Sequence, residues 1–149
     1  MSDLSIDKVA FVSHAMLAGG SPVYDTGGSG VCDSGWYFRS INNRSHAWSG
    51  VGKLYSFITT NTTKGPKATK INYSNIYLPD GNYPYTYGDL MQFHNGTKWI
   101  HSAIITGHTY INGSSSTVEA TVTYRTASGG NYKKNYRQSS VYSGHSRRV

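Results

Sequence analysis

The chain has a single cysteine, Cys32, among its 149 residues, and this scarcity excludes two classes of small protein. One cysteine cannot form a disulfide framework, and it cannot supply a multi-cysteine zinc site. A chain of this length buries roughly 68–70% of its unfolded surface, so a hydrophobic core can hold it together without covalent links. We therefore expect one domain over residues 1–149, with no disulfide and no cofactor.

Acidic residues are also scarce, because seven Asp and Glu face fourteen Lys and Arg, for a formal net charge of +7. Such a balance permits attraction to nucleic acid, acidic lipid or anionic cell-wall polymers. The basic residues are poorly clustered outside a polar tail at 126–149. We therefore expect no specific nucleic-acid interface, although a basic surface-binding module without enzymatic activity stays open as an alternative.

Long apolar runs are missing as well. No stretch approaches the roughly 20 residues of a membrane span, so we expect no membrane-spanning segment. The first residues, Met1 to Leu4, lack the basic and apolar segments of a signal peptide. The weakly charged composition, rich in glycine and tyrosine, is typical of extracellular bacterial domains, and we expect an extracellular or cell-wall location. The oligomeric state stays open.

Apolar residues recur at helical spacing over 7–18 and again over 46–60, which predicts two helices. Gly19-Gly20 ends the first helix, and Asp7 stands where a carboxylate can cap its first amides. Ser45 is in place to cap the second helix. Both helices are expected to bury an apolar face.

From residue 67 onward we expect β structure, because residues 117–124 alternate as a strand does and Asn95-Gly96 indicates a hairpin turn. Helices followed by an antiparallel sheet predict an α+β fold with N-terminal helices packed on a C-terminal sheet. The strands are predicted at 67–73, 90–94, 99–106, 117–124 and 146–149, with a short aromatic segment at 36–38.

His101 is the strongest functional candidate from the residues alone. It lies in a predicted strand among apolar neighbours, so it serves either as a catalytic base or as a core histidine bonded to backbone. Cys32 is a second candidate nucleophile, but Asp33 beside it disfavours a thiolate. His14 and His46 have no partners at ligand spacing, so we expect no metal site.

Several short motifs recur in one order along the chain, and together they resemble the putative amidase domain family of bacterial proteins. That family is a branch of the papain-like fold, related to cell-wall hydrolases of the NlpC/P60 type. The resemblance covers roughly residues 7–126. Its motifs are Asp7, Phe11-Val12-Ser13, Ala18-Gly19-Gly20, Trp36-Tyr37-Phe38, Ser45 with Trp48, Val51, Leu54 and Tyr55, Gly88 to Phe93, and His101 to Thr106.

The resemblance implies a cysteine at the start of the first helix, a strand histidine as base, and a third polar residue that orients the histidine. His101 matches the histidine position. Lys8 stands where the family has its cysteine, directly after Asp7, and Arg125 stands near the third position. Lysine cannot replace a thiolate, and arginine cannot accept a hydrogen bond from an imidazole.

We therefore expect a papain-like amidase domain that has lost catalysis and binds a peptide or a peptidoglycan stem. The alternative is an active cysteine amidase or peptidase of the cell wall, in which the loop brings Cys32 to His101.

Overall fold

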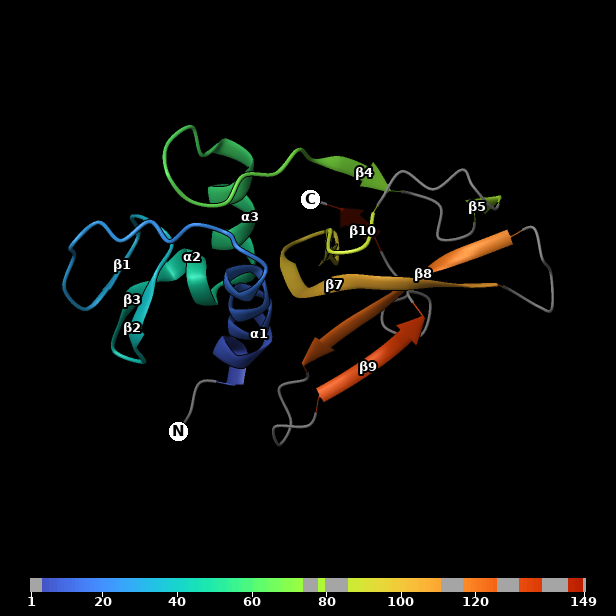
Figure 1. Cartoon of the computed structure of the whole chain (residues 1–149), viewed down its shortest axis with the longest axis horizontal. Helices are drawn as coiled ribbons and strands as arrows, with labels where there is room; N and C mark the ends of the chain where they lie inside the picture. Colours follow the sequence, from blue (N-terminus) through green and yellow to red (C-terminus); the bar gives the residue numbers. More distant parts are fainter. Residues whose placement is uncertain are drawn as a thin grey trace.

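The computed structural model describes residues 4–73, 78–79, 86–110, 117–125, 132–137 and 145–148. Three helices lie between a small sheet and a larger one (Figure 1). The helices are α1 (Leu4–Ala18), α2 (His46–Ser49) and α3 (Val51–Thr60). The strands are β1 (Val31–Cys32), β2 (Phe38–Ser40), β3 (Asn43–Ser45), β4 (Ile71–Tyr73), β5 (Leu78–Pro79), β6 (Leu90–His94), β7 (Trp99–Tyr110), β8 (Thr117–Arg125), β9 (Tyr132–Arg137) and β10 (His145–Arg148).

The larger sheet has seven strands in the order β4-β10-β6-β7-β8-β5, and β9 also pairs with β8. All its pairings are antiparallel. The predicted α+β class is therefore confirmed, and helices α1 and α3 contact β7 of this sheet. The predicted strand 67–73 is confirmed only at 71–73. The final strand, predicted at 146–149, spans His145–Arg148.

The hairpin that joins β6 to β7 follows the sequence prediction closely. The Asn95 side chain accepts hydrogen bonds from the amides of Thr97 and Lys98 at 3.0 and 2.9 Å. Gly96 has a φ of 97°, a left-handed conformation that glycine adopts without steric cost. The asparagine carboxamide and the glycine thus close a turn that fixes the register of the two strands.

The predicted helix 46–60 is wrong as a continuous element, because it divides at Gly50 into α2 and α3. Gly50 has the extended dihedrals φ −110° and ψ 129°, and its amide closes α2 on the carbonyl of His46. A Cβ atom at this position would lie 3.1 Å from that carbonyl oxygen. Glycine has the lowest helix propensity apart from proline, so the break occurs at the residue that stabilises a helix least.

The predicted first helix begins three residues too late. Helix α1 starts at Leu4, so Asp7 lies inside its first turn and does not precede it. Ser45 precedes α2 as predicted, but its hydroxyl makes no capping bond. Instead, the amide of Tyr37 donates to Ser45 Oγ at 3.1 Å, which attaches the small sheet to the start of α2.

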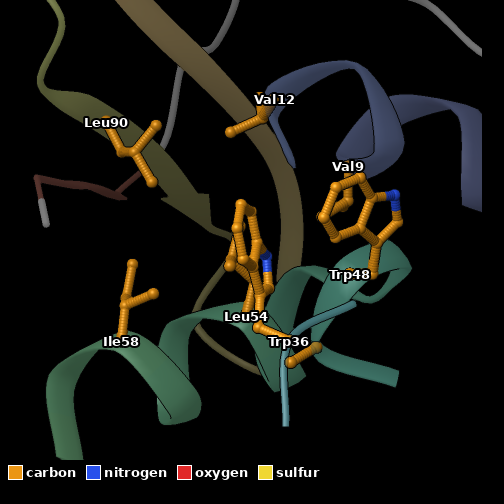
Figure 2. Packing of buried hydrophobic residues seen from close by; sticks show 8 residues of the cluster. Val9, Val12, Trp36, Trp48, Leu54, Ile58 and Leu90 are labelled. Atoms are coloured by element: carbon orange, nitrogen blue, oxygen red, sulfur yellow. The ribbon is translucent and has the colours of Figure 1, made fainter. Parts of the chain in front are cut away.

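Two buried clusters lie on opposite faces of the larger sheet. The first joins the helices to the sheet and contains Val9, Val12, Trp36, Ala47, Trp48, Leu54, Ile58 and Leu90 (Figure 2). The second contains Met91, Phe93, Ala103, Ile105, Ala120, Val122 and Tyr124. Since side chains alternate along a strand, Leu90 and Met91 belong to different faces. This division decides which site residues can meet.

Candidate functional site

His101 lies on the sheet face that points away from the helices. In the register of β6 and β7 it is paired with Phe93, a member of the second cluster. Its ring packs edge-on against Tyr124, with 4.7 Å between the ring centroids, and lies 6.1 Å from Phe93. The neighbouring Ser102 belongs to the opposite face, where its hydroxyl is 2.8 Å from the carboxamide nitrogen of Gln92. His101 is thus a half-buried histidine in an aromatic environment.

Arg125 ends β8 and falls on the other face. Residues Val122 and Tyr124 alternate into the second cluster, so Thr123 and Arg125 belong to the face of the helices. Thr123 supports this assignment, because its hydroxyl lies 3.0 Å from that of Thr106 on β7. The alternation therefore does not bring the Arg125 side chain to the ring of His101.

Lys8 is the fifth residue of α1, so it lies in the second helical turn. The free amides and the positive end of a helix dipole belong to the first turn. Asp7 occupies that first turn. Position 8 is therefore one residue beyond the place where a dipole acts most strongly on a side chain.

Cys32 lies in β1 of the small sheet. Figure 1 shows that this sheet and β7 lie on opposite sides of α1 and α2. Its sulfur is 2.8 Å from the hydroxyl of Tyr37 and 3.8 Å from that of Ser34. Within the described residues, no hydrogen bond joins Cys32 to His101. The geometry does not bring the second candidate nucleophile to the candidate base.

The hydroxyl of Tyr37 has the largest effect on the acidity of this thiol. It lowers the pKa of Cys32 from its usual value, with a smaller contribution from Ser34, because a hydrogen-bond donor stabilises the thiolate. The negative charge of Asp33 acts in the opposite direction. The pKa of Tyr37 is correspondingly raised, since ionised tyrosine could not donate this bond.

The partners of Asp33, the residue next to Cys32, are not apparent from the sequence. Asp33 Oδ1 accepts from His46 Nδ1 at 2.7 Å and from Lys53 Nζ at 3.0 Å. His46 holds the pKa of the Asp33 carboxyl below its usual range, and Lys53 adds to the effect. No signal in the sequence indicates these contacts, because Asp33, His46 and Lys53 come together only through the fold of the small sheet and the helices. All three side chains are exposed to solvent, so the group joins α2, α3 and the small sheet at the surface.

A second ion pair stabilises the same sheet. Arg39 donates to both carboxylate oxygens of Asp25, at 2.8 Å from Nε and 2.5 Å from Nη2. Its guanidinium also lies 4.9 Å from the centre of the Tyr37 ring and donates to the carbonyl of Gly28. The pKa of Asp25 is lowered chiefly by Arg39. These contacts give the glycine-rich segment a fixed geometry.

The motif residues that carry the family resemblance are mainly packing residues. Ser13, fully buried, donates its hydroxyl hydrogen to the Trp48 carbonyl at 2.8 Å and accepts from Trp36 Nε1 at 3.3 Å. The two tryptophan rings lie 4.5 Å apart. One serine hydroxyl therefore joins α1, α2 and the aromatic segment before β2.

The described part of the chain contains no group of three His, Cys, Asp or Glu side chains arranged to bind a metal ion. None of the described helices is both long and apolar enough to cross a membrane.

Comparison with known proteins identifies the family of the chain. The family model described as "Putative amidase domain" matches residues 3–148, almost the whole chain. A search of curated proteins gave no match, and a search of solved structures gave none either. The extent of the family match decides the assignment: this chain belongs to the putative amidase domain family.

Proposed function

We propose that this protein is an amidase-family domain that binds a peptide or a peptidoglycan stem without cleaving it. The observation that carries the proposal is the position of the single cysteine. The chain has one cysteine, and the sulfur of that cysteine is hydrogen-bonded to the hydroxyl of Tyr37 in the small sheet. The proposal takes Lys8, in α1, to stand at the position of the family nucleophile. A cysteine amidase needs a thiolate within reach of its base.

The environment of His101 supports the same proposal. A general base must lie within hydrogen-bond reach of the proton that it removes. The ring of His101 packs between Tyr124 and Phe93, on the sheet face opposite Ser102. Neither aromatic side chain is a nucleophile of amide hydrolysis. In this proposal the papain-like architecture persists as a binding scaffold, and its net charge of +7 suits anionic wall polymers outside the cell.

The test restores the missing groups. We would prepare Lys8→Cys together with Arg125→His in a Cys32→Ser background, so that position 8 carries the only thiol. The unaltered protein is expected to release no product from peptide and peptidoglycan-stem amides, while binding the same compounds in equilibrium titrations. The altered protein is expected to gain labelling by an electrophilic peptide.

The matched control is Cys32→Ser alone, which removes the natural thiol and leaves position 8 unchanged. Hydrolysis by the unaltered protein that disappears in Cys32→Ser would show that the chain is an active cysteine amidase, contrary to the proposal. Failure of the unaltered protein to bind any of the peptide amides would contradict the binding role.

A further inference from the structure

A cavity of about 910 Å³ lies on the helix side of the larger sheet, away from the ring of His101. Its walls come from the second half of α1, the end of α3, the loop 63–68, the turn before β6, and the helix-facing sides of β7 and β8. Ligand sites in proteins commonly range from about 300 to 1,000 Å³, so this volume suits a small organic molecule or a short peptide.

The inner surface of the cavity is mainly apolar. Phe11 and Met16 contribute from α1, Ile58 from α3, and Leu90 and Ile104 from the sheet. Ile58 and Leu90 point toward one another from α3 and β6 (Figure 2). An apolar ligand would exchange contact with water for contact with these side chains, which is the main source of affinity in such sites.

The rim of the cavity carries two cations. Lys64 and Lys67 both line it and are both exposed, and neither ammonium has a carboxylate partner among the described residues. Asp89 is the single acid of the lining, and its Oδ2 accepts from the amide of Thr86 at 2.8 Å. The hydroxyls of Thr106 and Thr123 add hydrogen-bonding groups on the sheet wall. The lining therefore has an apolar interior and a net positive edge.

From these features we infer that the cavity binds a ligand with an apolar body and a terminal carboxylate, with the body between α1 and the sheet and the carboxylate at Lys64 and Lys67. A peptide with an apolar last residue and a free C-terminus has this chemistry, and the threonine hydroxyls can bond its amides. A fatty acid shares the chemistry apart from the amides. This inference rests on the proposed binding role and names where and what the domain binds.

The test is titration calorimetry at low ionic strength with N-acetyl-Ala-Leu, its C-terminal amide and decanoate. The peptide acid is expected to bind saturably, and its amide more weakly. Lys64→Gln and Lys67→Gln should each weaken binding of the acid by about two- to fivefold, since exposed ion pairs contribute modestly. The double variant should bind about tenfold more weakly. Ala15→Leu, which adds volume to the α1 wall, should weaken both peptides.

The matched control is Lys98→Gln, because Lys98 is an exposed lysine in the β6–β7 turn, outside the cavity lining. Equal binding of the acid and the amide, or equal weakening by Lys98→Gln and the rim variants, would overturn the inference. Binding of decanoate without the peptide would assign the same cavity to lipid acids. If peptide binding were unchanged in both the rim variants and Ala15→Leu, the cavity would not be the binding site, while the proposed binding function would stand.

Discussion

At the scale of single residues, the pKa of the Cys32 thiol is affected most strongly by one neighbour. The Tyr37 hydroxyl, 2.8 Å from the sulfur, lowers the pKa of Cys32. We expect alkylation of Cys32 by iodoacetamide to rise with pH around a midpoint below that of a free cysteine, because the thiolate is the reacting form. Tyr37→Phe should move this midpoint to higher pH. The measurement is the alkylation rate as a function of pH.

Tyr87→Phe is the matched control for this prediction, because Tyr87 is an exposed tyrosine bonded to His108 and remote in sequence from Cys32. It should leave the midpoint unchanged. An unaltered midpoint in Tyr37→Phe would mean that the tyrosine does not stabilise the thiolate.

Lys8 illustrates a different dependence on position. The helix dipole acts mainly within the first turn, and Lys8 follows that turn. A cysteine introduced there would gain less from the dipole than the resemblance alone implies. The Lys8→Cys variant therefore tests whether a thiol deeper in the helix becomes reactive without contact with His101, whose ring lies on the opposite face of the larger sheet.

At the scale of elements, the glycine-rich segment depends on Gly35. Its φ is 77°, and a Cβ atom there would lie 2.3 Å from the Tyr24 carbonyl oxygen. That carbonyl accepts from the Trp36 amide at 2.8 Å and thus holds the buried tryptophan in place. Gly35→Ala should destabilise the protein by about 1–2 kcal/mol for the left-handed backbone and by about 1–3 kcal/mol more for the steric collision. Urea denaturation measures the sum.

Gly27→Ala separates the two costs. Gly27 has the same φ of 77°, but no atom lies within 4 Å of a Cβ built on it. The Gly27→Ala variant should therefore be destabilised only by the cost of the left-handed backbone, about 1–2 kcal/mol. If the two variants were equally destabilised, the close approach of Gly35 to Tyr24 would have no energetic consequence.

The elements that the sequence predicts well are those with a clear period or a clear turn. Strand β8 alternates polar and apolar residues along its length, and the Asn95-Gly96 turn marks the hairpin of β6 and β7. Strands β1 and β3 have two and three residues, too few to show any period, so the small sheet was not predicted. The break at Gly50 was missed because the apolar spacing continues across it.

The candidate site was harder to predict than the fold. His101 could be placed on a strand, but the face that it occupies depends on register with Phe93. The contacts among Asp33, His46 and Lys53 join residues 13 and 20 positions apart through a fold that no local pattern specifies. The cavity behind Lys64 and Lys67 likewise requires the packing of α1 against the sheet.

At the scale of the whole molecule, the larger sheet separates two buried clusters that share no residue. Ile58→Val in the first cluster and Ile105→Val in the second should each lower the free energy of unfolding by about 0.5–1.5 kcal/mol. Because the sites have no common partners, the double variant should equal the sum within about 0.5 kcal/mol. Chemical denaturation followed by tryptophan fluorescence and by circular dichroism measures all three variants.

The two probes also test whether the clusters unfold together. Trp36 and Trp48 report on the helix side, whereas circular dichroism reports on the backbone of both layers. Coincident transitions are expected, since the sheet forms one wall of each cluster. A helix layer that melted first, or a double variant far from additive, would contradict this account.

The bond network of Ser13 has a consequence for what family membership means. Ser13, Trp36 and Trp48 are motif positions whose buried side chains contact one another. Their packing contributes to the stability of the helix layer. A sequence signature built on such positions records inheritance of an architecture, and it can outlast the reaction for which that architecture is named.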